Sequence, residues 1–227
     1  MRLFKKVLAV SVASMCALSL AACGGSKSAE TTAAASSESK EESKAGESVS
    51  EAVAATGKDA KDIKVGISIY KFDDNFMTLY RNELVRYLTE DCGIPKDNIV
   101  VQDGKNDQAE QTNQINNFIA TKVDVMILNL VQSSSAPTVT DLAKEAGIPV
   151  VYINREPDET EESRWASDGI KATYVGADAR QSGTFQGEEI AELDNKGDIN
   201  GDGTVKYIMI QGDPENIDAQ YRTEYSV

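Results

Sequence analysis

The sequence of 227 residues contains no histidine. This absence excludes imidazole acid–base catalysis, Ser-His catalytic triads and His-rich metal sites. Basic residues are also in the minority, because 23 Lys and Arg stand against 37 Asp and Glu, for a formal net charge of -14. Such a balance argues against a basic surface that binds nucleic acid or an anionic membrane.

Cysteine is scarce, and of the three cysteines Cys16 lies in a predicted export signal and Cys23 directly follows it. A basic start (1–6) precedes an apolar run, Val7 to Leu20, that is too short for a comfortable transmembrane helix. The run ends in Leu20-Ala21-Ala22-Cys23-Gly24, which resembles a bacterial lipobox. We therefore predict a lipoprotein signal peptide over residues 1–22, lipidation of Cys23 and a membrane-anchored location outside the cytoplasm. The alternative is a plain secretory signal that happens to be cut before a cysteine.

The third cysteine, Cys92, would then be the only free thiol of the mature chain, so no internal disulfide is expected. Cys92 ends an apolar helix pattern, which favours a packing role. Between Gly24 and Ala60 the composition shifts to Ser, Ala, Glu, Lys and Thr. A segment this polar cannot bury enough surface to offset its ordering entropy, so residues 23–60 are predicted to be a disordered tether.

From Ile63 onward short apolar runs alternate with amphipathic stretches, the pattern of parallel βαβ units. The predicted fold is α/β, a doubly wound parallel-sheet sandwich. Strands are expected at Ile63–Tyr70, Asn98–Gln102, Val123–Leu128, Pro149–Ile153, Thr173–Gly176 and Val205–Gln211. Helices are expected at about Asn75–Glu90, Gln108–Ala120, Ala136–Ala146 and Arg180–Asp194.

The stretch VGISIYKFDDNF (Val65 to Phe76) places carboxylates, an amide and aromatic rings where a buried strand turns into a helix. Ligands of open α/β sheets bind beyond the carboxyl ends of the strands, and a sugar needs polar partners and an aromatic face. The alternative is an ordinary turn in which Asp73 or Asp74 caps the helix and Phe76 is buried. The apolar stripe along this helix is interpreted as core, and its members are Phe76, Tyr80, Leu84, Tyr87 and Leu88.

Four strings together resemble the periplasmic-binding-protein type I family, and among its members the galactose- and glucose-binding receptors. They are VGISIYKFDDNF, DGKNDQAEQTNQI (Asp103 to Ile115), VVYINREP (Val150 to Pro157) and YVGADARQSG (Tyr174 to Gly183). The resemblance implies two α/β lobes, with the N-terminal lobe at 61–175 and the start of the C-terminal lobe at 176–227. The first hinge crossing would lie near Gly176 to Asp178. The second lobe would be incomplete, so we expect a truncated fragment of a longer reading frame that binds sugar weakly or not at all by itself.

Carried over residue by residue, the resemblance predicts a sugar site shared by the two lobes. On the first lobe, Phe76 would stack on the sugar ring while Asp74 and Asn154 bind hydroxyls; Tyr70 and the weaker candidate Arg155 would lie beside them. Asn154 also ends an apolar strand run, so the strand-edge rule places it there independently. The alternative for Asn154 is an Asx turn.

On the second lobe, the string QGDPENIDAQYR (211–222) matches the family's next binding loop and supplies Asn216, Asp218 and Arg222. Asp218 and Arg222 are four residues apart, so the alternative is a routine helical salt bridge. The most similar family members carry a histidine where this chain has Asn216, which leaves the sugar preference open.

A calcium-loop pattern precedes that string, with candidate ligands Asp198, Asn200, Asp202 and Thr204. Lys206 departs from the pattern, because a cation cannot bind calcium, and the resembling family completes the loop with a distant glutamate. We therefore expect calcium in a complete protein more than in this chain. The alternative is an Asx-rich turn.

The resemblance implies a non-enzymatic, monomeric receptor that passes a galactose- or glucose-type monosaccharide to an ABC permease, with a chemoreceptor as a further partner. A receptor for another monosaccharide, such as a pentose, is the first alternative. The fold also forms the effector lobe of bacterial repressors, but the export signal argues against that function. A glycoside-processing enzyme would need two carboxyl groups flanking the bond, which the adjacent Asp73 and Asp74 do not obviously provide.

Overall fold

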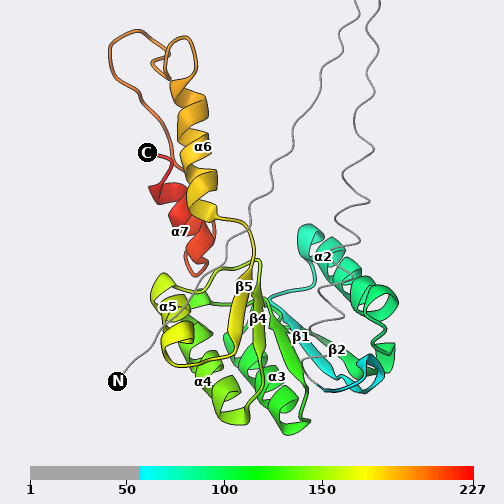
Figure 1. Cartoon of the computed structure of the whole chain (residues 1–227). Coiled ribbons are helices and arrows are strands. Elements are labelled where there is room, and N and C mark those ends of the chain that lie inside the picture. The colour runs from blue at the N-terminus through cyan, green and yellow to red at the C-terminus, as the bar shows by residue number, and fades with distance from the viewer. Residues whose placement is uncertain (1–56) are drawn as a thin grey trace, which may run out of the picture.

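The computed structural model describes residues 57–227. They form a five-stranded sheet, and helices cover both of its faces (Figure 1). The predicted signal peptide, Cys23 and nearly all of the predicted tether lie outside these residues. Every strand pair is parallel, and the strand order is β2-β1-β3-β4-β5. The strands are β1 (Val65–Ile69), β2 (Ile99–Asp103), β3 (Val125–Leu128), β4 (Val150–Ile153) and β5 (Ala172–Val175).

The α-helices follow the strands in the alternation that the sequence predicts. They are α2 (Asn75–Arg86), α3 (Gln108–Ala120), α4 (Ala136–Ala146), α5 (Glu159–Ser167), α6 (Ala179–Ala191) and α7 (Ile217–Glu224). Short helical turns lie at η1 (Ala60–Asp62), η2 (Tyr87–Asp91), η3 (Lys96–Asn98) and η4 (Ser133–Ser135). The predicted doubly wound α/β fold is thereby confirmed. Within residues 57–227 no helix combines the length and apolar character needed to cross a bilayer.

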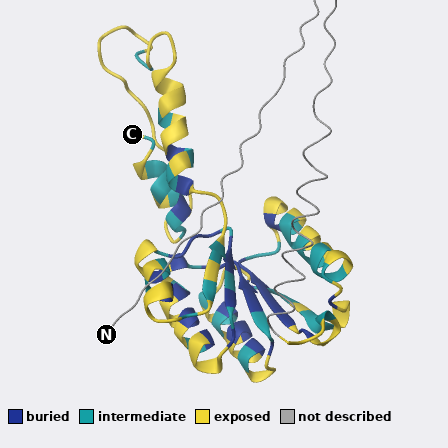
Figure 2. Ribbon diagram, viewed as in Figure 1, coloured by how far each residue is buried: buried dark blue, intermediate teal, exposed yellow. Residues whose placement is uncertain are grey.

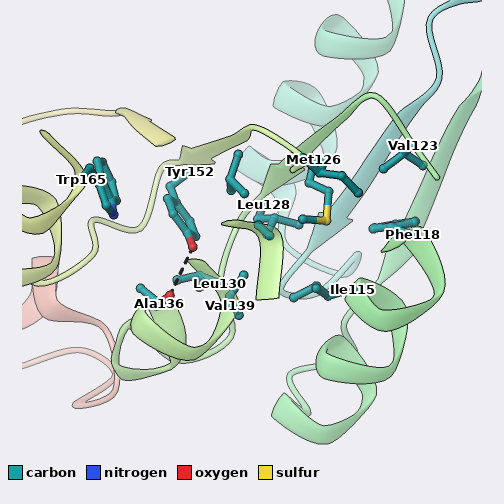
Figure 3. Packing of buried hydrophobic residues seen from close by; sticks show 13 residues of the cluster. Ile115, Phe118, Val123, Met126, Leu128, Leu130, Ala136, Val139, Tyr152 and Trp165 are labelled. Carbon is teal, nitrogen blue, oxygen red and sulfur yellow. Dashed lines mark hydrogen bonds between the residues drawn. The ribbon is translucent and has the colours of Figure 1, made fainter. Parts of the chain in front are cut away.

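One face of the sheet packs on α3, α4 and α5, and Figure 3 shows this cluster. The rings of Tyr152 and Trp165 stack there with their centroids 5.5 Å apart. Gly66 allows α3 to approach β1, because a Cβ at this position would lie 2.7 Å from the Phe118 ring. Burial of aromatic and β-branched side chains on this scale supplies most of the favourable free energy of such a fold.

The opposite face packs on α2 and the segments beside it. Its buried members include Ile67, Ile69, Met77, Ile127 and Ile153. All five residues of β1 are buried, as expected for a central strand of a parallel sheet that is covered on both faces. Cys92 is partly buried against this cluster as a free thiol, and burial raises its pKa, in keeping with the predicted packing role.

The helices α6 and α7 form a separate pair beyond the carboxyl edge of the sheet (Figure 1). A three-residue link, 176–178, joins β5 to α6 at the predicted hinge position. The two helices approach closely at Gly183 and Gly187. A Cβ at either position would lie 2.9 Å from a backbone carbonyl oxygen, of Arg222 and of Ser226 respectively. Figure 2 shows that most of α6 and the loop after it are exposed.

The prediction of a strand at Val205–Gln211 is wrong, because this segment forms no strand in the structure. A strand needs a neighbour for its backbone hydrogen bonds, and within residues 57–227 none pairs with it. Ile208 and Ile210 are accordingly 91% and 88% exposed. The predicted helix 75–90 is α-helical only to Arg86 and then continues as a π-turn, and the predicted 180–194 helix ends at Ala191.

Helix α5 was not among the predicted helices. This helix is polar, and its buried residues are only Glu161 and Trp165, so it lacks an apolar stripe. Its N-terminal cap, Asp158, was the available signal.

Candidate functional site: the carboxyl edge of the sheet

The carboxyl ends of β1, β3 and β4 meet at one edge of the sheet because the three strands are parallel and adjacent. Tyr70, Asn129 and Asn154 each follow the last residue of one of these strands. Two of these residues were predicted for the site, whereas Asn129 was missed. The strand-edge rule that selected Asn154 applies equally to Asn129, which follows the apolar run of β3.

Asp74 lies just beyond β1 and caps α2. Its Oδ1 accepts a hydrogen bond from the Met77 backbone N–H at 2.7 Å, and its Oδ2 accepts one from the Tyr70 hydroxyl at 2.7 Å. The bond from Met77, followed by that from Tyr70, lowers the pKa of Asp74. Burial and the same carboxylate raise the pKa of Tyr70 to about 12. The edge therefore holds an ionised acceptor beside a hydroxyl that stays protonated at neutral pH.

Phe76 is 60% exposed, so the prediction that it belongs to the core stripe is wrong, and so is the alternative that buries it. Tyr80, Leu84 and Leu88 of the same stripe do pack partly against the core. Phe76 stands in the first turn of α2, two residues after the cap Asp74, and belongs to neither core cluster. Its ring centroid lies 6.1 Å from that of Tyr80, and both rings line a surface hollow of about 430 Å³ on α2.

Asn154 has a left-handed backbone, with φ 64°, at the point where the chain leaves β4. Its side-chain Oδ1 accepts from the Asn129 Nδ2 at 3.2 Å, and no Asx-turn bond forms with its own backbone neighbours. Its backbone carbonyl accepts a hydrogen bond from the Tyr174 hydroxyl at 3.0 Å. Asparagine tolerates this backbone region better than most residues, which suits it to the position.

Arg155 is 5% exposed and lies between the sheet and the segment before α7. Its guanidinium carbon lies 4.0 Å from the centroid of the Tyr70 ring, and its Nη1 donates to the Val131 carbonyl at 2.5 Å. Its Nη2 lies 3.3 Å from the Asp213 carboxylate. With these partners Arg155 joins two parts of the chain, and the structure places it next to Tyr70 of the predicted site.

Asp218 is 3% exposed and also links the two parts. Its Oδ1 accepts from the Glu156 backbone N–H at 3.2 Å, and its Oδ2 lies 4.0 Å from the Arg222 guanidinium. The helical ion pair weighed as an alternative is thus present at the outer limit of distance. Burial raises the pKa of Asp218 in spite of these partners. Asn216 caps α7, since its side chain accepts from the Asp218 backbone N–H at 3.1 Å.

Arg180 and Glu156 form a further bridge that was not predicted. The Arg180 Nη1 lies 3.0 Å from the Glu156 carboxylate, and its guanidinium carbon lies 3.9 Å from the centroid of the Tyr221 ring. The Ser133 backbone N–H also donates to the Glu215 carbonyl at 3.2 Å. The sheet and the α6–α7 pair are therefore joined by buried polar contacts around the 154–156 turn. No local sequence pattern identifies partners that are more than twenty residues apart.

The predicted calcium loop forms an exposed turn. Both carboxylate oxygens of Asp198 accept backbone N–H groups, at 2.9 Å from Gly201 and 2.8 Å from Gly203. The Asp202 carboxylate pairs with Lys206 at 2.5 Å and accepts from Asn200 at 2.9 Å. Among residues 57–227 no group of three acidic or thiol side chains is arranged to hold a metal ion. The oxygens as they stand do not fit a calcium ion, and calcium stays a prediction of the sequence pattern.

A family model described as a periplasmic binding protein domain matches residues 65–226. The D-galactose/methyl-galactoside binding periplasmic protein of Haemophilus influenzae is 34% identical over 171 residues, which cover 74% of this chain and 50% of that protein. A putative rhizopine-binding protein of Rhizobium meliloti is 37% identical over 160 residues, covering 70% of this chain and 47% of that protein.

Among solved structures, an ABC transporter solute binding protein of Bacillus halodurans with bound myo-inositol matches with a TM-score of 0.59 and 27% identity. The match covers 74% of this chain and 52% of that chain. The chain spans about half the length of the curated relatives it matches. The resemblance drawn from the sequence strings is confirmed, and the chain belongs to the periplasmic binding protein domain family.

Proposed function

We propose that the chain is part of an exported receptor that binds a monosaccharide of the galactose or glucose type and passes it to an ABC permease. The observation that carries the proposal is that the ionised Asp74 and the exposed ring of Phe76 lie at the start of α2, which follows β1, while the amide of Asn154 follows β4 at the same edge of the sheet. A sugar offers hydroxyls for the first two and a C–H face for the third. The relatives named for galactoside and myo-inositol support a polyhydroxylated ring as the ligand.

The second lobe contributes Asp218 and Arg222 to this proposal, and Asn216 beside them at the start of α7. The contacts from residues 213–218 to the turn at 154–156 hold α7 against that edge. A receptor of this kind works through differential affinity for open and closed states and needs no turnover. The exposed Asp73, which pairs with Lys71, and the capping Asp74 do not form the two facing carboxyl groups of a glycosidase.

Titration of the full chain with D-galactose, D-glucose, D-ribose and myo-inositol, followed by ¹⁵N NMR, tests the proposal and detects millimolar binding. Asp74→Asn should weaken binding by about ten- to a hundredfold, since it removes a charged acceptor. The matched control, Asp73→Asn, removes the adjacent exposed charge and should leave the affinity unchanged. Saturable binding that Asp74→Asn leaves unchanged would overturn the proposed site, and absence of saturable shifts with all four ligands would show that these residues alone do not bind a sugar.

A receptor for another monosaccharide, such as a pentose, is the second candidate. Asn216 supports this second candidate. Its Oδ1 caps α7, and its side chain is a short amide where the resembling receptors have a histidine. Tighter binding of D-ribose than of D-galactose in the same titration would select this candidate.

We also propose that Cys23 anchors the receptor to the membrane through a lipid, that a chemoreceptor is a further partner and that the receptor is monomeric. Metabolic labelling with an alkyne palmitate tests the anchor. Label should enter the wild-type chain and be absent from Cys23→Ser. Equal labelling of both chains would contradict lipidation at this residue.

A further inference from the structure

The orientation of the Asn129 side chain is determined by backbone groups on both sides. Asn129 is fully buried, and its Oδ1 accepts from the Tyr70 backbone N–H at 3.3 Å. Its Nδ2 donates to the Ile153 carbonyl at 3.1 Å. A backbone N–H can only donate and a carbonyl can only accept, so the amide of Asn129 cannot be reversed without losing both bonds.

Gln111 of α3 fixes the backbone around Asn129 through two hydrogen bonds. The Gln111 Nε2 donates to the Asn129 backbone carbonyl at 2.9 Å, and its Oε1 accepts from the Val131 backbone N–H at 2.8 Å. Gln111 is also fully buried and donates to the Ser68 hydroxyl at 3.1 Å. A buried polar network in which each member is satisfied is rigid, because every displacement leaves a donor or acceptor unpaired.

This network sets which end of Asn154 faces outward. The second hydrogen of the Asn129 Nδ2 goes to the Asn154 Oδ1, at 3.2 Å. The Asn154 Nδ2 donates to no group within residues 57–227, and it is not one of the buried side-chain atoms that lack a partner. It is therefore not fully buried and is left to donate to a ligand. The backbone is held as well, since the Asn154 N–H donates to the Val175 carbonyl at 3.1 Å.

We propose that Asn129 is a positioning residue that turns Asn154 into an obligate hydrogen-bond donor at the candidate site. This inference rests on the proposed function and narrows its ligand class. Asp74 is an acceptor and Asn154 is a donor. Together they would bind a polyol that donates one hydroxyl hydrogen to Asp74 and accepts a hydrogen bond from Asn154 through one oxygen lone pair. A ligand with only donors at the second position would be rejected, because the amide cannot turn to accept.

The decisive variant is Asn154→Asp, which is isosteric and keeps an oxygen for the Asn129 Nδ2 while it replaces the outward donor with an acceptor. Aspartate also tolerates the left-handed backbone. Its affinity for D-galactose in the NMR titration should fall by at least about tenfold, the effect of one lost hydrogen bond to a ligand. Unchanged affinity would overturn the assignment of Asn154 as a donor.

A second variant tests the positioning by Asn129 without any ligand. In Asn129→Asp the inward oxygen repels the Asn154 Oδ1, so the Asn154 amide should turn and donate to the introduced carboxylate. Hydrogen exchange of the assigned Asn154 side-chain amide should then slow by about tenfold or more relative to the wild type, because its protons gain a buried acceptor. Asn117→Asp makes the same chemical change at an exposed position on α3 and should leave that exchange unchanged.

Equal Asn154 exchange in the wild type and Asn129→Asp would overturn the positioning role. If Asn129→Asp does not fold, a different measurement takes its place. This is the hydrogen exchange of the Asn129 side-chain amide, measured in the Asn154→Asp variant. That amide should stay protected there, and loss of its protection would overturn the proposal. Failure of the wild type to bind any sugar would bear on the proposed function alone, since the exchange measurements need no ligand.

Discussion

At the scale of single residues, Asp74 performs two tasks with two oxygens. One oxygen caps α2 through the Met77 N–H, and the other accepts from the Tyr70 hydroxyl. The capping interpretation and the ligand interpretation of this residue are therefore compatible, because a carboxylate oxygen has lone pairs for a further donor.

Substitution of Asp74 separates the cap from the charge. Asp74→Ala should lower the free energy of unfolding by about 1 kcal/mol, the usual cost of a lost N-cap. Asp74→Asn should lower the free energy of unfolding by only a few tenths of that amount, since asparagine caps helices as well as aspartate. Urea unfolding of the two variants beside the wild type measures the difference. Equal losses in both variants would mean that the charge, and not the cap, stabilises α2.

The residues of the candidate site differ in how far the sequence could predict them. Asn154 directly follows β4, and Asp74 lies in the turn between β1 and α2. A strand end is visible in the sequence as the end of an apolar run. The burial of Arg155 and Asp218 is not visible in this way, because it arises from contacts between segments that are about sixty residues apart. For both residues the neighbouring sequence predicts an exposed charged side chain.

At the scale of elements, the α6–α7 pair depends on the absence of side chains at Gly183 and Gly187. A Cβ at Gly183 would lie 2.9 Å from the Arg222 carbonyl oxygen and 3.0 Å from the Tyr225 Cβ. Both neighbours belong to α7 or follow it directly, so neither can move without the helix. The close approach requires glycine for reasons of space, since Gly183 has an ordinary helical backbone.

Gly183→Ala should therefore loosen α7 without unfolding the sheet. We expect the amides of α7 to exchange about tenfold faster, which corresponds to an overpacking cost at the lower end of about 1–3 kcal/mol. Gly212→Ala is the matched control, because its Cβ would meet the Ala219 Cβ at an ordinary 3.4 Å. Native-state hydrogen exchange measures both, and unchanged exchange in Gly183→Ala would contradict the packing described for the pair.

The buried Asp218 gives the contact between α7 and the sheet a pH dependence. Burial raises its folded-state pKa, so its contribution to stability is complete below pH about 4 and is lost as the pH rises through the folded pKa. Asp218→Asn keeps an acceptor for the Glu156 N–H and removes the charge. We expect about equal stability of variant and wild type at pH values below the ordinary aspartate pKa of about 4, and a growing advantage of the variant toward neutral pH.

Urea unfolding at several pH values measures this difference. Asp73→Asn, at an exposed position, is the control and should change the free energy of unfolding by less than about 0.5 kcal/mol at every pH. A constant difference between Asp218→Asn and the wild type would show that the carboxyl does not titrate across this range.

The elements themselves were predicted best where periodicity and termini agree. The helices 108–120 and 136–146 have the predicted bounds. Their caps, Asp107 and the C-terminal Gly147, are strong local signals. The prediction of a strand at 205–211 was wrong, because an apolar run indicates only that a segment is able to form a strand. The strand forms only if a neighbouring strand pairs with it.

At the scale of the whole molecule, apolar surface is unevenly distributed. The sheet region buries two clusters, whereas the loop after α6 exposes Ile199, Ile208 and Ile210 at 88–91%. Together with the end of α6, this loop lines an apolar hollow of about 610 Å³. Contiguous exposed apolar surface promotes association.

Replacement of Ile208 and Ile210 by serine should therefore reduce self-association. We expect a several-fold lower fluorescence of a hydrophobic dye and slower growth of light scattering on heating, with an unchanged unfolding midpoint of the sheet. Val100→Ser changes one isolated exposed residue on β2, which is 43% exposed, and should leave both signals as in the wild type. An unchanged dye signal in the double variant would mean that this loop does not make the accessible patch.

The link at 176–178 has a consequence for how the chain can be cut. Gly176, Ala177 and Asp178 are all exposed, and every member of both core clusters lies before them. A protease that nicks the link should leave a folded five-stranded fragment. The α6–α7 piece, with few buried residues of its own, should then stay attached only as long as the Arg155–Asp213 and Arg180–Glu156 ion pairs hold. Raised salt, which weakens such attractions, should turn one nicked particle into two.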